Sequence, residues 1–127
     1  MLKKEALSSN VVNVSFLIEQ LSGNLEDISM MISIFLDQSE EKITALKESV
    51  QNKNFKEIKS IAHFLKSSFT IMGLSSKDLL SEIEKLGAME KDLEKINQLC
   101  NIVFKDHAES TIEYKKILSK INTLTDK

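Results

Sequence analysis

The sequence predicts an all-α protein, an antiparallel up-and-down four-helix bundle with a short additional N-terminal helix. Three observations favour this fold class. Proline is absent and glycine occurs only three times in 127 residues, so little interrupts regular structure. Hydrophobic residues make up 42% of the chain, and they recur in steps of three and four, the period of one helix face. A chain this short holds one hydrophobic core, so we expect residues 1–127 to form a single domain.

The first two helices are expected on either side of a short polar turn. The short N-terminal helix is indicated by Val12, Phe16, Leu17 and Leu21. Ser22-Gly23-Asn24 then suits a helix stop followed by a new N-cap. The second helix begins near Leu25, and its inner stripe comprises Leu25, Ile28, Ile32, Phe35, Ser39, Ile43, Leu46 and Val50. This stripe stays on one face for about seven turns, with serine as its polar interruption.

Three further helices complete the predicted bundle. After a turn at residues 51–54, the third helix ends or bends at Gly73, and its inner residues are Ile58, Ile61, Ala62, Leu65, Phe69 and Met72. The fourth begins at Ser75 or Ser76 and stops at Gly87, with Leu79, Leu80, Ile83 and Leu86 inside. The last begins near Asp92, and its stripe reads Leu93, Ile96, Cys100, Val103, His107, Tyr114, Ile117, Leu118, Ile121 and Leu124. Amphipathic helices joined by short turns pack most economically up and down.

Composition excludes several classes of function. The net charge of −2 and the pI near 5.7 give no global basic field, which argues against nucleic-acid binding. We find neither a signal peptide nor a run of roughly 18 apolar residues, so we expect no membrane association and a cytoplasmic monomer. The single cysteine, Cys100, lies on an inner stripe and is expected to be a buried thiol without chemistry. No spacing of ligands predicts a metal or cofactor.

His63 breaks the inside-outside pattern of the third helix. At about 100° per residue, it projects roughly 140° away from the inner stripe, on the solvent side. Several polar side chains project within about 50° of a common direction near it, namely Lys56, Lys59, Lys66, Ser67 and Thr70. The pattern therefore predicts an exposed histidine in a basic strip that carries hydroxyl groups.

This strip suits phosphoryl transfer. A neutral imidazole offers a ring-nitrogen lone pair to an electrophile at pH 7. Lys66, three residues along the helix, can neutralise a phosphoryl group on the ring, and Ser67 can add a hydrogen bond. Such an exposed helix face suits a carrier over which a partner's active site closes. Spacing alone also allows a solvated surface histidine among lysines.

The local sequence around His63 resembles a known signature. The run from Ala62-His63-Phe64-Leu65-Lys66-Ser67-Ser68 to Gly73-Leu74, followed by Ile83-Glu84-Lys85-Leu86, resembles histidine-containing phosphotransfer (HPt) domains over about residues 12–120. Leu74 and Ile83 depart from the commoner residues. The resemblance implies that His63 is the phospho-acceptor, that Lys66 neutralises the phosphate, and that Ser67 lets a receiver domain approach. It further implies a phosphorelay intermediate that accepts the group from a receiver aspartate and passes it to another receiver, with Mg²⁺ held by the receiver.

Other functions remain alternatives. The dimerising domain of sensor kinases also carries a phosphorylated histidine, but Phe64 and the absence of proline argue against it. No glycine-rich nucleotide loop is present, so we expect a phosphocarrier and not an ATP-dependent kinase. The phosphotransfer domain of chemotaxis kinases shares the His-x-x-Lys spacing and stays open. A helical adaptor that binds signalling partners without being phosphorylated is the alternative from a different class.

A docking surface for the receiver is expected beside His63. Met30 and Ile34 lie roughly opposite the inner stripe of the second helix, and Phe64 lies off that of the third. The predicted partner-binding residues are Met30, Ile34, Lys59, Phe64 and Thr70. The alternative is that the short first helix covers Met30 and Ile34.

Two further sets of polar residues are assigned no function. His107 belongs to an inner stripe and is expected to be partly buried and hydrogen-bonded. The acidic residues are interpreted as solvated helix faces paired with nearby lysines, and they are Glu40, Glu41, Glu82, Glu84, Glu90, Asp92 and Glu94.

Overall fold

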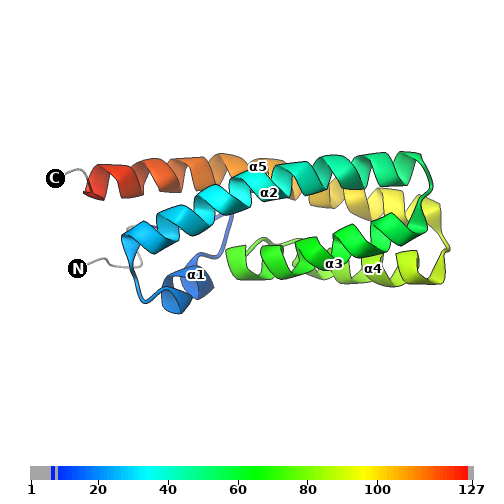
Figure 1. The fold of residues 1–127 in the computed structure, drawn as a ribbon, viewed down its shortest axis with the longest axis horizontal. Helices are drawn as coiled ribbons and strands as arrows, with labels where there is room; N and C mark the ends of the chain where they lie inside the picture. Colours follow the sequence, from blue (N-terminus) through cyan, green and yellow to red (C-terminus); the bar gives the residue numbers. More distant parts are fainter. Residues whose placement is uncertain (1–6, 8, 126–127) are drawn as a thin grey trace.

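The computed structural model describes residue 7 and residues 9–125. These residues form five α-helices: α1 (Ser15–Gln20), α2 (Leu25–Gln51), α3 (Phe55–Met72), α4 (Lys77–Met89) and α5 (Leu93–Thr125). Helices α2 to α5 run alternately up and down, each packs on its neighbour in sequence, and α5 closes the ring against α2 (Figure 1). The predicted four-helix bundle with a short N-terminal helix is therefore confirmed.

Local residues set several of the helix ends. Asn24 and Asn54 cap α2 and α3, since each side-chain oxygen accepts a hydrogen bond from the backbone N–H three residues on, at 3.0 and 3.2 Å. Gly73 adopts the left-handed conformation after α3, so it ends that helix. The predicted stop of α4 at Gly87 is wrong. The helix continues to Met89, and Glu90 takes the left-handed position.

Gly87 instead allows two helices to approach closely. It lies inside α4 and faces α3, where an added Cβ would be 3.1 Å from the backbone nitrogen of Lys59. A larger residue would push against α3 backbone, which cannot move aside as a flexible side chain could. The absence of a side chain at Gly87 thus brings the facing residues of α3 and α4 into reach of one another.

The predicted stripes form the core, with two clear exceptions. Phe16 and Leu124 were expected inside but are 45% and 42% exposed. Helix α1 begins only at Ser15 and buries Leu17 and Ile18, so Phe16 points the other way. Leu124 lies in the last turn of α5, which extends past the start of α2 (Figure 1). Six further stripe residues are only partly buried against the core: Leu21, Leu25, Val50, Leu79, Leu93 and Leu118.

The polar residues of the stripes have partners in the core. Ser39 Oγ and His107 Nε2 lie 2.8 Å apart in a buried hydrogen bond, and the His107 ring stacks on Phe69 with 6.1 Å between ring centroids. Burial lowers the pKa of His107, so its ring is neutral at pH 7. Both the buried histidine and the serine interruption are thereby explained. Cys100 is fully buried as expected, and burial raises the pKa of its thiol to about 12.

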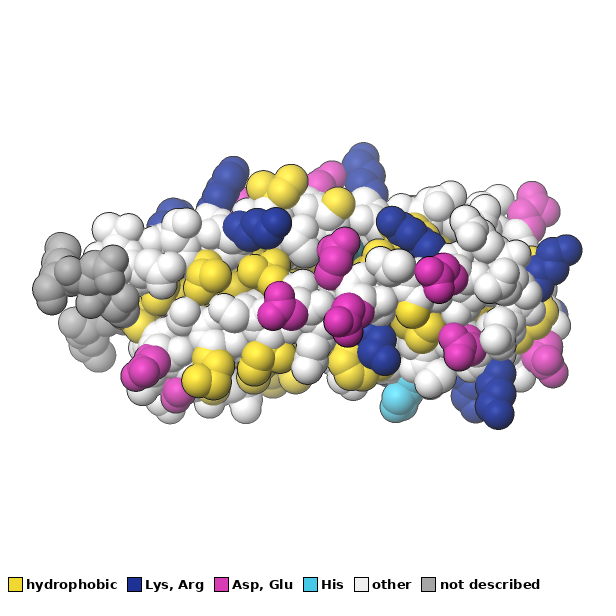
Figure 2. All heavy atoms as spheres, turned by 45° about the horizontal axis from the view of Figure 1, so that its top comes forward, with side chains coloured by type: hydrophobic (Ala, Val, Ile, Leu, Met, Phe, Trp, Pro, Cys, Tyr) yellow, Lys and Arg dark blue, Asp and Glu magenta, His cyan; other side chains and the backbone are white. Residues whose placement is uncertain are grey.

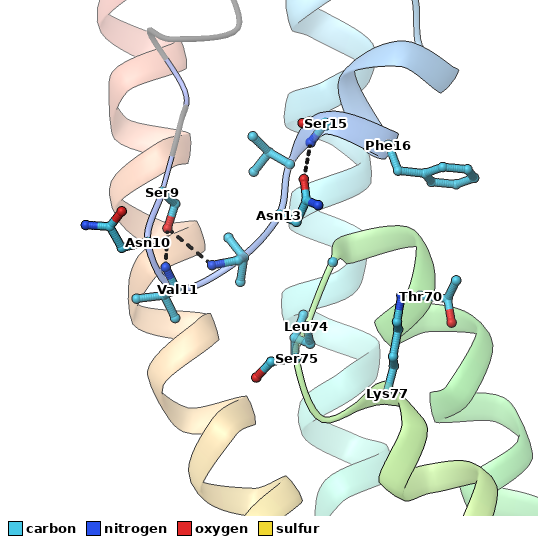
Figure 3. A pocket seen from close by; sticks show the side chains of 13 residues that line it. Ser9, Asn10, Val11, Asn13, Ser15, Phe16, Thr70, Leu74, Ser75 and Lys77 are labelled. Carbon is cyan, nitrogen blue, oxygen red and sulfur yellow. Dashed lines mark hydrogen bonds between the residues drawn. The ribbon is translucent and has the colours of Figure 1, made fainter.

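The segment before α1 is tied to the end of α3. Residues 9–14, here called the N-terminal strap, run beside the α3–α4 turn (Figure 3). The Asn13 N–H donates a 2.9 Å hydrogen bond to the Gly73 carbonyl, and Val12 forms an isolated antiparallel bridge with Leu74. The strap therefore occupies part of the chain that the sequence assigned to the first helix, and it covers the core where α3 ends.

Gly73 provides a test of this contact. An added Cβ at Gly73 would lie 1.9 Å from the Asn13 carbonyl oxygen, whereas nothing lies within 4 Å of one at Gly23, and both glycines have a positive φ. Gly23→Ala should cost about 1 kcal/mol from backbone strain alone. Gly73→Ala should cost at least ~2 kcal/mol more, because the strap must also move. Urea unfolding measures the free energy of unfolding of both variants. An equal decrease in the two would show that the strap does not pack on Gly73 in solution.

Candidate functional site

His63 stands on the outer face of α3. The buried residues Ile61, Ala62 and Leu65 turn toward the core, and the His63 side chain is consequently 66% exposed. Figure 2 shows a histidine standing out from the edge of the molecule, with lysine, acidic and apolar side chains nearby. The predicted orientation of His63 is confirmed.

A carboxylate from α4 contacts both His63 and Lys66. Glu84 Oε2 lies 2.8 Å from His63 Nδ1, and its Oε1 accepts a 2.8 Å hydrogen bond from Lys66 Nζ. The side chain of Glu84 is 21% exposed and that of Lys66 is 35% exposed. We call His63, Lys66 and Glu84 the Glu84 cluster.

The charge of Glu84 fixes the hydrogen on the His63 ring. The hydrogen bond from Lys66 is the largest cause that lowers the pKa of Glu84 below its ordinary value. Desolvation, next in size, raises this pKa, and the hydrogen bond from His63 lowers it again, so the pKa stays below its ordinary value. Glu84 is therefore ionised at neutral pH and can only accept hydrogen bonds. It follows that Nδ1 carries the proton of the neutral ring. The lone pair then lies on Nε2, which has no hydrogen-bond partner among the described residues.

Sequence reasoning missed the role of Glu84. It interpreted this residue as one of several solvated carboxylates paired with lysines, and it described the strip around His63 as basic. The pairing with a lysine is confirmed, but Glu84 is partly buried and also binds His63. The available signal was the segment Ile83-Glu84-Lys85-Leu86, which contributed to the family resemblance without indicating that Glu84 reaches α3.

Two different grooves flank α3 near His63. The apolar groove, between α2 and α3, has a volume of about 350 Å³ and is lined by Met31, Ile34, Phe35, Gln38, His63, Phe64, Ser67, Ser68, Ile71 and Met72. The polar groove, between α3 and α4, has a volume of about 550 Å³ and is lined by Lys66, Ser67, Thr70, Ile71, Lys77, Asp78 and Ser81. Ser67 borders both grooves, one turn from His63.

The predicted partner-binding residues divide between these surfaces. Ile34 and Phe64 line the apolar groove and are 43% and 39% exposed. Met30, 59% exposed, is on α2 outside the groove lining, so α1 covers neither Met30 nor Ile34. Thr70 borders the polar groove, and its hydroxyl donates to the Lys66 carbonyl. Lys59 is exposed one turn before His63, away from both grooves.

Several residues of the apolar groove were missed. Met31, Gln38 and Ile71 lie on the flanks of their helices, between the inner and outer faces. Whether such positions are covered depends on the rotation of the neighbouring helix, and one helix's periodicity does not reveal that. A further neighbour is Lys42 of α2, whose ammonium lies 4.8 Å from the centroid of the Phe64 ring.

Other kinds of site find no support in the described residues. Over the described part of the chain, no three His, Cys, Asp or Glu side chains gather as ligands for a metal ion. None of the helices in that part is both long and apolar enough to span a membrane.

Comparisons with known proteins agree with this geometry. A family model described as Hpt domain matches residues 30–110, more than half of the chain. Among solved structures, the fold is similar to histidine-containing phosphotransfer protein B (HptB) from Pseudomonas aeruginosa PAO1, with a TM-score of 0.80. The similarity covers 89% of this chain and 98% of that chain, at 18% sequence identity. No curated protein matches the chain.

The ion pair in the Glu84 cluster can be tested by titration. Replacing Lys66 by methionine should raise the pKa of Glu84, because the Lys66 hydrogen bond is the largest cause of its depression. The folded-state value lies below the unfolded one, so the stability from Glu84 is present at neutral pH and is lost as the pH falls through the folded-state pKa. Carbon-13 NMR of the glutamate carboxyls measures the midpoint, with Glu82 as the internal control. An unchanged Glu84 midpoint in Lys66→Met would contradict the pairing.

Proposed function

Because this chain belongs to the Hpt domain family, whose members are phosphocarriers in histidine phosphotransfer relays, we propose that His63 is its phosphorylated residue. One observation carries the assignment. The chain has two histidines; His107 is 3% exposed and bonded to Ser39 in the core, whereas His63 is exposed and has a free Nε2. Of the two histidines, only His63 can be enclosed by the active site of a partner.

The proposed transfer proceeds by attack of Nε2 on the aspartyl phosphate of a receiver domain. The lone pair of Nε2 forms the N–P bond while the P–O bond to the aspartate breaks, and that electron pair remains on the released carboxylate. Nδ1 keeps its proton, so the ring becomes positively charged. Glu84 accepts a hydrogen bond from Nδ1–H and favours that charge. The next receiver reverses the step with its own aspartate.

Lys66 and Ser67 are proposed to support the phosphoryl group. Lys66 can turn its ammonium from Glu84 toward the phosphoryl oxygens, and Ser67 is small enough to let the receiver approach while offering a hydroxyl group. The Mg²⁺ ion and acidic pocket of the reaction are expected in the receiver. We further propose that the chain acts as a monomer in the cytoplasm, without ATP-dependent kinase activity of its own.

The apolar groove is the proposed docking site for the receiver. It ends at His63, and Ile34 and Phe64 expose apolar surface beside it. A helix of the partner packed there would place the partner's active site over the ring. Lys42, whose ammonium lies over the Phe64 ring of the groove, and Lys59, one turn before His63, would then contribute to partner choice.

Phosphorylation of His63 can be tested directly. Incubation with a phosphorylated receiver should give an acid-labile, alkali-stable phosphate on the native protein, because phosphohistidine has this stability. His63→Gln should abolish the signal, and circular dichroism should show an unchanged helix content, since His63 packs outside the core. Phosphate that persists in His63→Gln would move the site elsewhere. Failure with every receiver would favour an adaptor that is never phosphorylated.

The docking site can be tested with charged substitutions. Ile34→Asp and Phe64→Asp should each slow phosphotransfer by roughly five- to thirtyfold at low receiver concentration, as expected when a central apolar contact is lost. The matched control is Ile112→Asp on α5, which alters an apolar residue of 57% exposure outside the groove. All three variants should stay folded. Transfer rates equal to that of Ile112→Asp would reject the apolar groove as the docking site.

A further inference from the structure

If His63 is phosphorylated as proposed, two anionic groups compete for Lys66, namely the Glu84 carboxylate and the phosphoryl group. In the unphosphorylated protein its ammonium donates to Glu84, and on the phosphoprotein it is needed by the phosphoryl group. We propose that Glu84 competes with the phosphoryl group for Lys66, and so keeps phospho-His63 short-lived and ready to donate. This inference rests on His63 being the phosphorylated residue.

The geometry makes Glu84 the fixed member of the cluster. Its carboxylate is 21% exposed and holds a different partner on each oxygen, 2.8 Å away in both cases. Its helix is held against α3 by the close approach at Gly87, three residues further along α4. Lys66 is more exposed and has a long flexible stem, so it is the group that can move. A phosphoryl dianion on His63 Nε2 would therefore be near the ionised carboxylate of Glu84, which stays in place.

Glu84 acts on the phosphoprotein in two ways, and each of them destabilises the N–P bond. By holding Lys66, it withholds positive charge from the phosphoryl oxygens. By accepting a hydrogen bond from Nδ1–H, it keeps the phosphorylated ring protonated, and a protonated ring departs as neutral imidazole when the N–P bond breaks. In that step the electron pair returns to Nε2, and an oxygen of water or of the acceptor aspartate forms the new P–O bond. Both effects shorten the life of the phosphohistidine.

Glu84→Gln separates these effects from simple support of the fold. The amide oxygen can still accept from Nδ1–H, but the variant has no charge with which to hold Lys66 or the ring proton. We expect the phosphohistidine half-life to lengthen roughly two- to fivefold, the size typical of one partly exposed ion pair. Glu82→Gln on the same helix removes the same charge outside the cluster and should leave the half-life unchanged.

The experiment uses the full chain and needs no receiver. Each protein is phosphorylated with phosphoramidate, a small nitrogen–phosphorus donor to imidazole, and the decay is followed by phosphorus-31 NMR. Lys66→Ala should shorten the half-life. Adding Glu84→Gln to Lys66→Ala should have a smaller effect than Glu84→Gln alone, because no ammonium remains for which the carboxylate and the phosphoryl group compete.

The pH dependence of the decay distinguishes an effect of Glu84 on the ring proton from simple support of the fold, which would leave the midpoint unchanged. The charged groups that face this site are Glu84 on α4, which contacts the His63 ring, Lys66 on α3, which contacts Glu84, Lys59 one turn before His63, and Lys42 on α2, which lies over the neighbouring Phe64 ring. Decay should slow as the pH rises and Nδ1 loses its proton. The midpoint should lie at lower pH in Glu84→Gln than in the native protein, since the carboxylate no longer holds that proton.

The outcomes are distinguishable. Equal half-lives in Glu84→Gln and Glu82→Gln, or a shorter half-life in Glu84→Gln, would overturn the role of Glu84 while phosphorylation of His63 stands. A native protein that neither phosphoramidate nor a phosphorylated receiver modifies at His63 would overturn the proposed function, and this inference with it.

Discussion

The close packing of α3 against α4 is the constraint on which the site depends. Gly87 has no side chain to separate the two helices, and it meets the backbone of α3 at Lys59. Glu84, one turn earlier on α4, is thereby brought against the outer face of α3, where it meets both His63 and Lys66. Without this approach His63 would be a solvated imidazole with no fixed tautomer. The carboxylate gives it a defined proton and a defined lone pair.

The two histidines show how environment decides the use of one residue type. His107 is enclosed by Phe35, Phe69 and Ser39, and burial lowers its pKa, so it is a neutral part of the core. His63 keeps its ring in solvent and has a charged neighbour on only one nitrogen. A carrier needs this second arrangement, because another molecule must reach the free nitrogen while the fold keeps the other nitrogen in place.

The surfaces on the two sides of α3 differ in a way that suits transfer between proteins. Toward α2 the groove is mainly apolar, as expected for a contact that many receivers can share. Toward α4 the groove carries Lys66, Lys77 and hydroxyl groups, which suit a phosphoryl group and charged partner residues. Ser67 lies between them without a bulky side chain. His63 itself lines the apolar groove and its side chain is 66% exposed, so another molecule can reach the ring.

The local pattern of residues was enough to predict the fold class, most helix ends and the outward direction of His63, because helical periodicity and capping are local properties of the chain. It also placed His107 and Cys100 inside. The packing of the helices was needed to show that Glu84 reaches His63, that Gly87 continues a helix, that Phe16 is exposed, and which flanking residues line the apolar groove. These features depend on how each helix is rotated and shifted against its neighbours, and an amphipathic stripe leaves that rotation free by tens of degrees.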